Sequence, residues 1–124
     1  MSPVMRFHSK HARAALVVLS LAASLGATAA PSDLDAQARE ALRNGQFRHT
    51  IDLTSEITRT DPLSTLNWYR LAIAADKERD FALAARALYT AERLDPSLSF
   101  ASSPERVQAL KSSIAAGGGV FVAP

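Results

Sequence analysis

Two neighbouring stretches decide the fold, Trp68-Tyr-Arg-Leu-Ala-Ile-Ala-Ala75 and Phe81-Ala-Leu-Ala-Ala-Arg-Ala-Leu-Tyr-Thr-Ala91. In each stretch the apolar residues step at helical spacing and share one face. Those of the first are Trp68, Leu71, Ala72 and Ala75, and those of the second are Ala84, Leu88 and Ala91. The alanines let two helices approach closely, and the aromatic residues fill the remaining space. The sequence therefore predicts a helical hairpin over about 64–77 and 81–93.

The same pattern occurs once before, at the offset that separates Phe47 from Phe81. Three other features recur at this offset: Asp61-Pro62 as Asp95-Pro96, Leu34 as Trp68, and Ala38 as Ala72. Chance could supply one such pair, but four pairs in one register are hard to obtain from composition alone. We therefore expect an earlier hairpin over about 33–43 and 47–59.

With this spacing and these residues the chain resembles the tetratricopeptide repeat, a helix-turn-helix unit of about 34 residues. The later copy matches the signature of the family at Trp68, Leu71, Ala72, Ala75, Phe81, Ala84, Leu88, Ala91 and Pro96. The earlier copy matches less well, because Gln37, Thr50 and Thr54 stand where alanine or larger apolar residues are usual. Arg79 also replaces the glycine that is common at the turn between the two helices. The resemblance implies two repeats within residues 30–98, at about 31–64 and 65–98.

Several residues indicate where the helices begin and end. Ser32, with Asp35 three residues later, and Ser64 are suited to cap the starts of two helices, and Gly45 stands where a helix should stop.

A further helix is expected after the second repeat, over about 104–115. Ser103-Pro104 is a helix-start signal, and Val107, Leu110 and Ile114 fall on one face. The end of a repeat stack needs a cover with a polar outer side, so we interpret residues 99–115 as a capping segment. Leu98 and Phe100 in the connector are expected to pack beneath it, and the alternative is that they form an exposed binding segment. We expect the glycine-rich tail 116–124 to be flexible.

The N-terminal residues read as a cleavable signal peptide, residues 1–29. Arg6, Lys10 and Arg13 precede a short apolar run that ends in the small residues Gly26-Ala-Thr-Ala29. An uncleaved anchor is the alternative, but the run is shorter than the roughly 20 residues that a membrane span needs. We expect an exported protein, periplasmic or secreted, with no stable membrane span in its mature form.

The charge distribution argues against nucleic acid as a partner. The leader carries three bases and no acid, which leaves residues 30–124 with 11 basic and 12 acidic residues. The basicity therefore belongs to the leader rather than to the mature chain. There is no cysteine, which excludes disulfides and thiolate metal sites.

No pattern indicates catalysis, a cofactor or a metal. His49 and Asp52 lie one helical turn apart, but nothing supplies a nucleophile in a defined geometry. Asp76, Glu78 and Asp80 alternate with Lys77 and Arg79, and lack the glycine and terminal glutamate of a calcium loop. We expect a solvated turn there, and a protein that is not an enzyme.

In the tetratricopeptide family the first helix of each repeat lines a concave groove, so the resemblance implies a partner-binding surface. The predicted groove residues are Arg39, Leu42, Arg43, Leu66, Tyr69, Ile73 and Lys77, with Asp35 and Asp76 beside them. Tyr69 and Ile73 lie off the apolar stripe of their helix, which favours an exposed aromatic anchor. The alternative is that both residues pack on the neighbouring repeat.

The fold class that we predict is all-α: two antiparallel helix-turn-helix tetratricopeptide hairpins plus a C-terminal capping helix, after the signal peptide. We expect a scaffold or adaptor that binds a protein or peptide segment, with self-association possible for so small a stack. The alternative is a helical carrier of a small apolar ligand, which would need a closed cavity.

Overall fold

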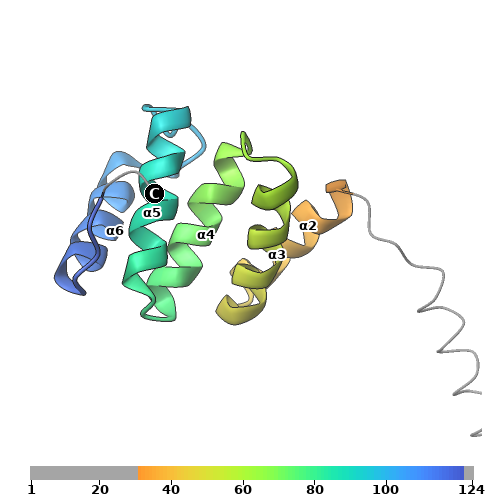
Figure 1. Cartoon of the computed structure of the whole chain (residues 1–124), viewed down its shortest axis with the longest axis horizontal. Coiled ribbons are helices and arrows are strands. Elements are labelled where there is room, and N and C mark those ends of the chain that lie inside the picture. Colours follow the sequence, from red (N-terminus) through yellow and green to blue (C-terminus); the bar gives the residue numbers. More distant parts are fainter. Residues whose placement is uncertain (1–30, 122–124) are drawn as a thin grey trace, which may run out of the picture. The chain divides into compact units, whose positions relative to one another are not determined.

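The computed structural model describes residues 31–121 of the chain. These residues form five helices, α2 (Pro31–Arg43), α3 (Phe47–Thr60), α4 (Thr65–Lys77), α5 (Phe81–Leu94) and α6 (Pro104–Ala116) (Figure 1). The all-α class is confirmed, and the predicted helix ends agree closely with the observed ones. The predicted leader, residues 1–29, lies outside the described residues.

Helices that follow one another in the chain pack as antiparallel neighbours. Helix α4 is the central element of this arrangement. It contacts each of the other four described helices, whereas α6 contacts only α4 and α5. The two hairpins, α2 with α3 and α4 with α5, are joined because α4 packs against both helices of the first one.

The described helices repeat at the interval found in the sequence. Each end of α4 and α5 follows the corresponding end of α2 and α3 at the offset that separates Phe47 from Phe81. The helix ends repeat as well, because the Asp61 N–H bonds Ile57 O at 2.7 Å and the Asp95 N–H bonds Ala91 O at 2.9 Å. A third copy would begin at residue 99, whereas α6 begins at Pro104.

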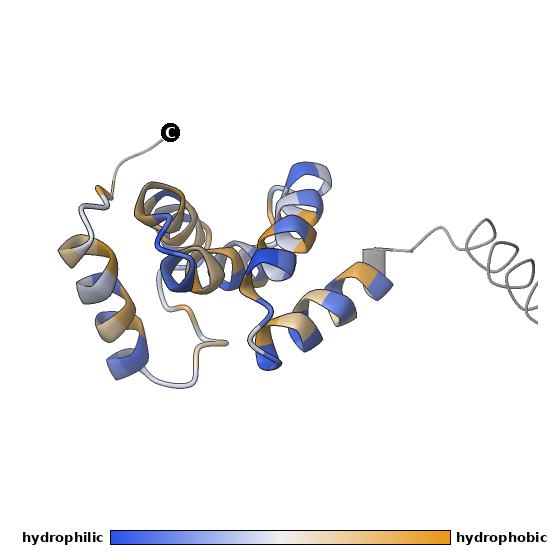
Figure 2. Ribbon diagram, turned by 90° about the horizontal axis from the view of Figure 1, so that it is seen from below, coloured by the Kyte–Doolittle hydropathy of each residue, from blue (hydrophilic) through white to orange (hydrophobic). Residues whose placement is uncertain are grey.

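The buried residues of α4 and α5 are mainly alanine. Residues with no exposed surface include Ala72, Ala74 and Ala75 on α4, and Ala84, Ala85, Ala87, Leu88 and Ala91 on α5. An alanine side chain ends at Cβ, so the two backbones can lie close together, and alanine loses no rotamer freedom on burial. A second, smaller core joins α2 to α3 through Ala38, Ala41, Leu53 and Ile57. Figure 2 shows hydrophobic residues alternating with hydrophilic ones along α2.

Three threonines form a buried row along α3. Thr50 and Thr54 have no exposed surface, and Thr58 is 4% exposed. Each hydroxyl donates to the carbonyl oxygen four residues earlier, at 2.8 Å. Thr50 and Thr54 therefore lie in the interior, as the repeat pattern requires. Their hydroxyl groups are hydrogen-bonded within the helix itself.

The turns inside the two hairpins have the same hydrogen-bond pattern. After α2, Gly45 has φ 74°, the Gln46 N–H bonds Ala41 O at 2.9 Å, and the Gly45 N–H bonds Leu42 O at 3.1 Å. This pattern is the Schellman motif, which needs a left-handed residue after the helix. The predicted stop at Gly45 is confirmed.

Arg79 occupies the equivalent left-handed position after α4, with φ 63°. The Asp80 N–H bonds Ala75 O at 2.8 Å and the Arg79 N–H bonds Asp76 O at 3.0 Å, so the motif forms without glycine. The Arg79 guanidinium lies 5.3 Å from the centre of the Phe81 ring. Because a side chain in this conformation crowds the backbone, the turn carries strain that Gly45 avoids.

The helix starts confirm some predicted caps and correct others. The Ser103 hydroxyl accepts a hydrogen bond from the Arg106 N–H at 3.1 Å, with Pro104 as the first helical residue. Ser64 precedes α4 as predicted, but it caps no backbone N–H and instead accepts from the Asn67 side chain at 2.9 Å. The capping role predicted for its hydroxyl is therefore wrong. Helix α2 already begins at Pro31, so Ser32 lies inside it rather than before it.

Helix α6 buries Leu110 and Ile114, as predicted from their spacing, and Val107 is partly buried beside them. The connector between α5 and α6 also packs inward: Leu98 is buried and Phe100 is partly buried against the same core. The expectation that Leu98 and Phe100 pack into the core is confirmed.

The tail after α6 packs back on the helices through Phe121, and its flexibility stays a prediction. The Gly119 N–H bonds Ile114 O at 2.9 Å, and Gly118 has φ 96°. A Cβ on Gly117 would lie 2.3 Å from the Phe81 ring, and one on Gly119 would lie 2.6 Å from Phe81 O. The glycines therefore allow close packing on α5, and the sequence-based prediction considered only their flexibility. Residues 122–124 lie outside the described part.

The turn at Arg79 yields a stability prediction. Replacing Arg79 by glycine removes the cost of the left-handed conformation, which is about 1–2 kcal/mol. Glycine also gives the unfolded chain more freedom, which offsets about half of that gain. Arg79→Gly should therefore stabilise the folded chain by roughly 0.5–1 kcal/mol. The matched change Gly45→Ala should destabilise by about 1 kcal/mol. Urea unfolding of the two variants and the native chain measures both changes. A destabilised Arg79→Gly would contradict the account and show that the stacking of Arg79 on Phe81 outweighs the strain.

Candidate functional site

A surface hollow of about 390 Å³ lies between α4 and α6. Its lining combines four predicted or adjoining groove positions of α4 with residues of α6: Tyr69, Ile73, Asp76, Lys77, Arg106, Ala109, Leu110 and Ser113. We call it the α4–α6 hollow. The structure therefore brings Tyr69, Ile73 and Lys77 together, as the sequence predicted.

The α4–α6 hollow has an apolar floor and a basic rim. Ile73 is partly buried and Leu110 is 9% exposed, whereas Lys77 and Arg106 are exposed. The carboxylate of Asp76 accepts a hydrogen bond from the Ser113 hydroxyl at 2.7 Å. The α6 residues could not be placed beside α4 from the sequence, since the repeat pattern ends before that helix.

Tyr69 does not have the exposed position predicted for it. It is 8% exposed, and its ring meets that of Phe100 edge to face, with centroids 5.3 Å apart and planes at 63°. Burial raises the pKa of the Tyr69 phenol, and the positive charge of Arg106 acts in the opposite direction. The exposed-anchor hypothesis is wrong because the chain's own connector covers this ring.

The other four predicted groove residues do not line the α4–α6 hollow. Arg39 and Arg43 are exposed on α2, and Arg43 forms an ion pair with Glu40 at 3.5 Å. Leu42 is partly buried against the main core, and Leu66 is partly buried in the first turn of α4. None of the α2 residues therefore lines the hollow beside Tyr69.

Asp35 has a different role from the one predicted. Its Oδ1 accepts a hydrogen bond from Arg70 Nη1 at 2.8 Å and another from Asn67 Nδ2 at 2.9 Å. Arg70 also donates to Asn67 Oδ1 at 3.2 Å, and its side chain is only 9% exposed. This polar network joins α2 to α4. Asp35 and Arg70 belong to different helices and share no helical period, so spacing could not reveal the pair.

The environment of Asp35 favours its charged form. Burial raises the pKa of its carboxyl, but the hydrogen bond from Asn67 and the charge of Arg70 outweigh that effect and hold it below 3.8. The ionised form of Asp35 is therefore preferentially stabilised in the folded chain.

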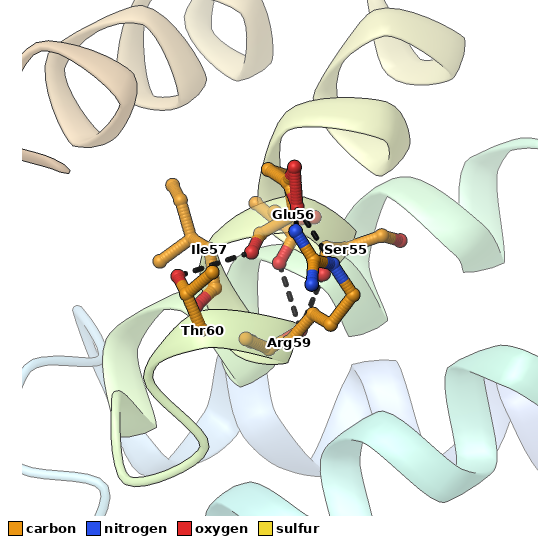
Figure 3. A network of polar contacts seen from close by, with 7 residues as sticks. Ser55, Glu56, Ile57, Arg59 and Thr60 are labelled. Atoms are coloured by element: carbon orange, nitrogen blue, oxygen red, sulfur yellow. Dashed lines mark hydrogen bonds and ion pairs between the residues drawn. The ribbon is translucent and has the colours of Figure 1, made fainter. Parts of the chain in front are cut away.

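A second hollow, of about 320 Å³, lies over Trp68 and Leu71 between α3 and α5. Trp68 is partly buried rather than fully so, and its indole N–H donates to Pro62 O at 2.7 Å. Arg59 on the rim is engaged, since its Nε donates to Glu56 Oε2 at 2.8 Å. Figure 3 shows this last turn of α3, where Thr60 also donates to Ile57 O at 3.1 Å.

Three of the residues considered for catalysis or metal binding, His49, Asp52 and Glu78, border one open surface hollow. His49 and Asp52 are both exposed, and Glu78 pairs with Arg48 at 3.2 Å. Within the described part of the chain, no three His, Asp or Glu side chains gather closely enough to hold a metal ion. Among the described helices, none is both long and apolar enough to cross a membrane.

Comparisons with known proteins identify no relative. No protein-family model matches the chain, and searches of curated proteins and of solved structures return no match.

The network at Asp35 predicts how stability depends on pH. Because the folded pKa is lowered, the pair stabilises fully above the unfolded value near 3.8 and loses that contribution as the pH falls through the folded value. Asp35→Asn should cost about 1–2 kcal/mol at pH 7, discounted because the Asp35 side chain is 37% exposed. Thermal unfolding at pH 7 and pH 3 measures the effect, and the variant should lose less stability on acidification than the native chain. Equal losses would contradict this assignment.

Proposed function

We propose that the protein is a non-catalytic interaction module of the tetratricopeptide type, a scaffold or adaptor that holds a segment of a partner protein. The observation that carries the proposal is the α4–α6 hollow, where apolar side chains and two exposed basic groups converge on one face of a helical repeat. Such a surface suits recognition of a chain segment, with an apolar anchor for affinity and charges for orientation.

The repeat interpretation is supported by agreement between sequence and structure. The four recurring sequence features, the ends of α2 to α5 and the Schellman turns at Gly45 and Arg79 all follow one common interval. In stacks of this kind the first helices of successive repeats line one surface. Here α4 is such a helix, and it lines the hollow together with α6.

The rim of the hollow favours a peptide over a small apolar ligand. A carrier would enclose its ligand among apolar side chains, whereas Lys77 and Arg106 border this hollow and are exposed. A segment with a large apolar residue near an acidic group satisfies both the floor and the rim.

We also propose that the protein acts after export, in the periplasm or cell envelope or outside the cell. The support is the sequence of residues 1–29, whose basic start, short apolar run and small residues before Ala30 match a signal peptide. Two repeats with a cover are near the lower size for a stable stack, which makes self-association a further proposal.

Capture of a partner tests the proposal. The full chain, expressed with a tag after Pro124 and purified from the exported fraction, should retain one specific protein and begin at Ala30 by intact mass. Lys77→Glu with Arg106→Glu should reduce the retained partner at least tenfold, because both changes reverse the charge of the rim. The control pair Arg39→Glu with Arg43→Glu, on exposed sites of α2, should retain it.

Equal capture by all three forms, each with native helical circular dichroism, would contradict the assignment of the partner site to the α4–α6 hollow. A chain that starts at Met1 and stays in the cytoplasm would contradict the proposal of export.

A further inference from the structure

The contact between Tyr69 and Phe100 shows what kind of side chain the α4 surface accepts. Phe100 belongs to the connector between α5 and α6, yet it packs on α4, edge to face with the ring of Tyr69. Edge-to-face aromatic pairs are favourable beyond the area that they bury. In Figure 2 the connector loops out on the side of α4 and α5 where α2 and α6 also lie. Phe100 therefore contacts Tyr69, a lining residue of the α4–α6 hollow, without lining the hollow itself.

The connector forms its hydrogen bonds with its own residues and with Asp95 rather than with α4. The Leu98 N–H bonds Asp95 O at 3.0 Å, and the Ala101 N–H bonds Leu98 O at 2.8 Å. Ser97 and Ser99 donate through their hydroxyls to Asp95, at 2.7 and 3.4 Å. Among the described residues, no hydrogen bond joins residues 96–102 to α4, so apolar contact alone holds Phe100 against Tyr69.

The connector has a second, buried anchor two residues before Phe100. Leu98 is 4% exposed and has φ 45°, in the left-handed region that residues with a Cβ adopt at a cost. Strain of this kind persists only where the surrounding contacts outweigh it. The core packing of Leu98 therefore holds the connector independently of the contact that Phe100 makes.

The chemistry beside Phe100 indicates the kind of segment that fits. Phe100 stands between Ser99 and Ala101, in the turn that the Ala101 N–H closes on Leu98 O, and these small neighbours let the turn approach a helix closely. Tyr69 also lines the α4–α6 hollow, so the aromatic contact borders the apolar floor and the basic groups of its rim.

We propose that the α4 surface at Tyr69 is an aromatic subsite, which Phe100 fills in the free protein. The partner segment supplies an aromatic side chain between small residues, and this side chain takes the place of Phe100. The inference deepens the proposed function and rests on it for the identity of the site.

Its test uses the chain's own segment as the probe and needs no partner. A short peptide that copies residues 97–103 is titrated by calorimetry into the full native chain and into Phe100→Ala. The control peptide carries alanine at the position of Phe100. The copy should bind Phe100→Ala at least tenfold more tightly than it binds the native chain, and the control peptide should bind neither.

A Phe100→Ala chain that folds cooperatively but does not bind the copy would overturn the subsite, since Phe100 would then be ordinary core packing. Equal binding to both chains would overturn it as well, because the site would then lie elsewhere. If Phe100→Ala does not fold, Phe100→Leu keeps the volume and loses the ring contact. The copy should still bind this chain more tightly than the native one, and no difference would count against the proposal. If the partner capture fails but the peptide binds as expected here, the adaptor role is rejected and the aromatic subsite stands.

Discussion

The close contact between α4 and α5 depends on alanine, and the rest of the described structure is arranged around it. Ala72, Ala75, Ala84, Ala87 and Ala91 have no exposed surface, and their short side chains let the two backbones lie close together. Helix α4 is thereby enclosed by the other four described helices and is buried on more than one face. The earlier hairpin repeats the arrangement less tightly, with Ala38 and Ala41 against leucine and isoleucine.

This central position explains why the candidate site collects on α4. One part of the helix faces α2, where Arg70 and Asn67 hold Asp35, and another faces α6 across the hollow at Ile73. Tyr69 lies between these regions and is covered by Phe100. A segment that binds there contacts the most enclosed helix of the described stack. Affinity then depends on the neighbours of α4, above all the connector, rather than on rearrangement of the core.

The helices could be predicted from the sequence because their signals are local. The signals are the spacing of the alanines, Gly45 and Ser103-Pro104, and each acts within one or two helical turns. The repeat offset predicted the same helices independently. The candidate site was predicted only in part, since three of its α4 residues were found but Arg106 and Leu110 of α6 were not. Three further features, the pairing of Asp35 with Arg70, the burial of Tyr69 and the packed tail, depend on contacts between distant segments, which periodicity does not encode. Gly117 illustrates this limit: the sequence showed its freedom, and only the fold showed the Phe81 ring against it.

The measurement that tests the central claim most directly is the unfolding free energy of Ala84→Leu beside Ala82→Leu. The two residues lie on the same helix, but Ala84 is fully buried against α4 whereas Ala82 is exposed. Added methylenes at a packed position force the helices apart, at a cost of roughly 1–3 kcal/mol. The account predicts a loss of that size, by urea unfolding, for Ala84→Leu and almost none for Ala82→Leu. Equal stability of the two variants would contradict the close alanine packing on which the arrangement depends.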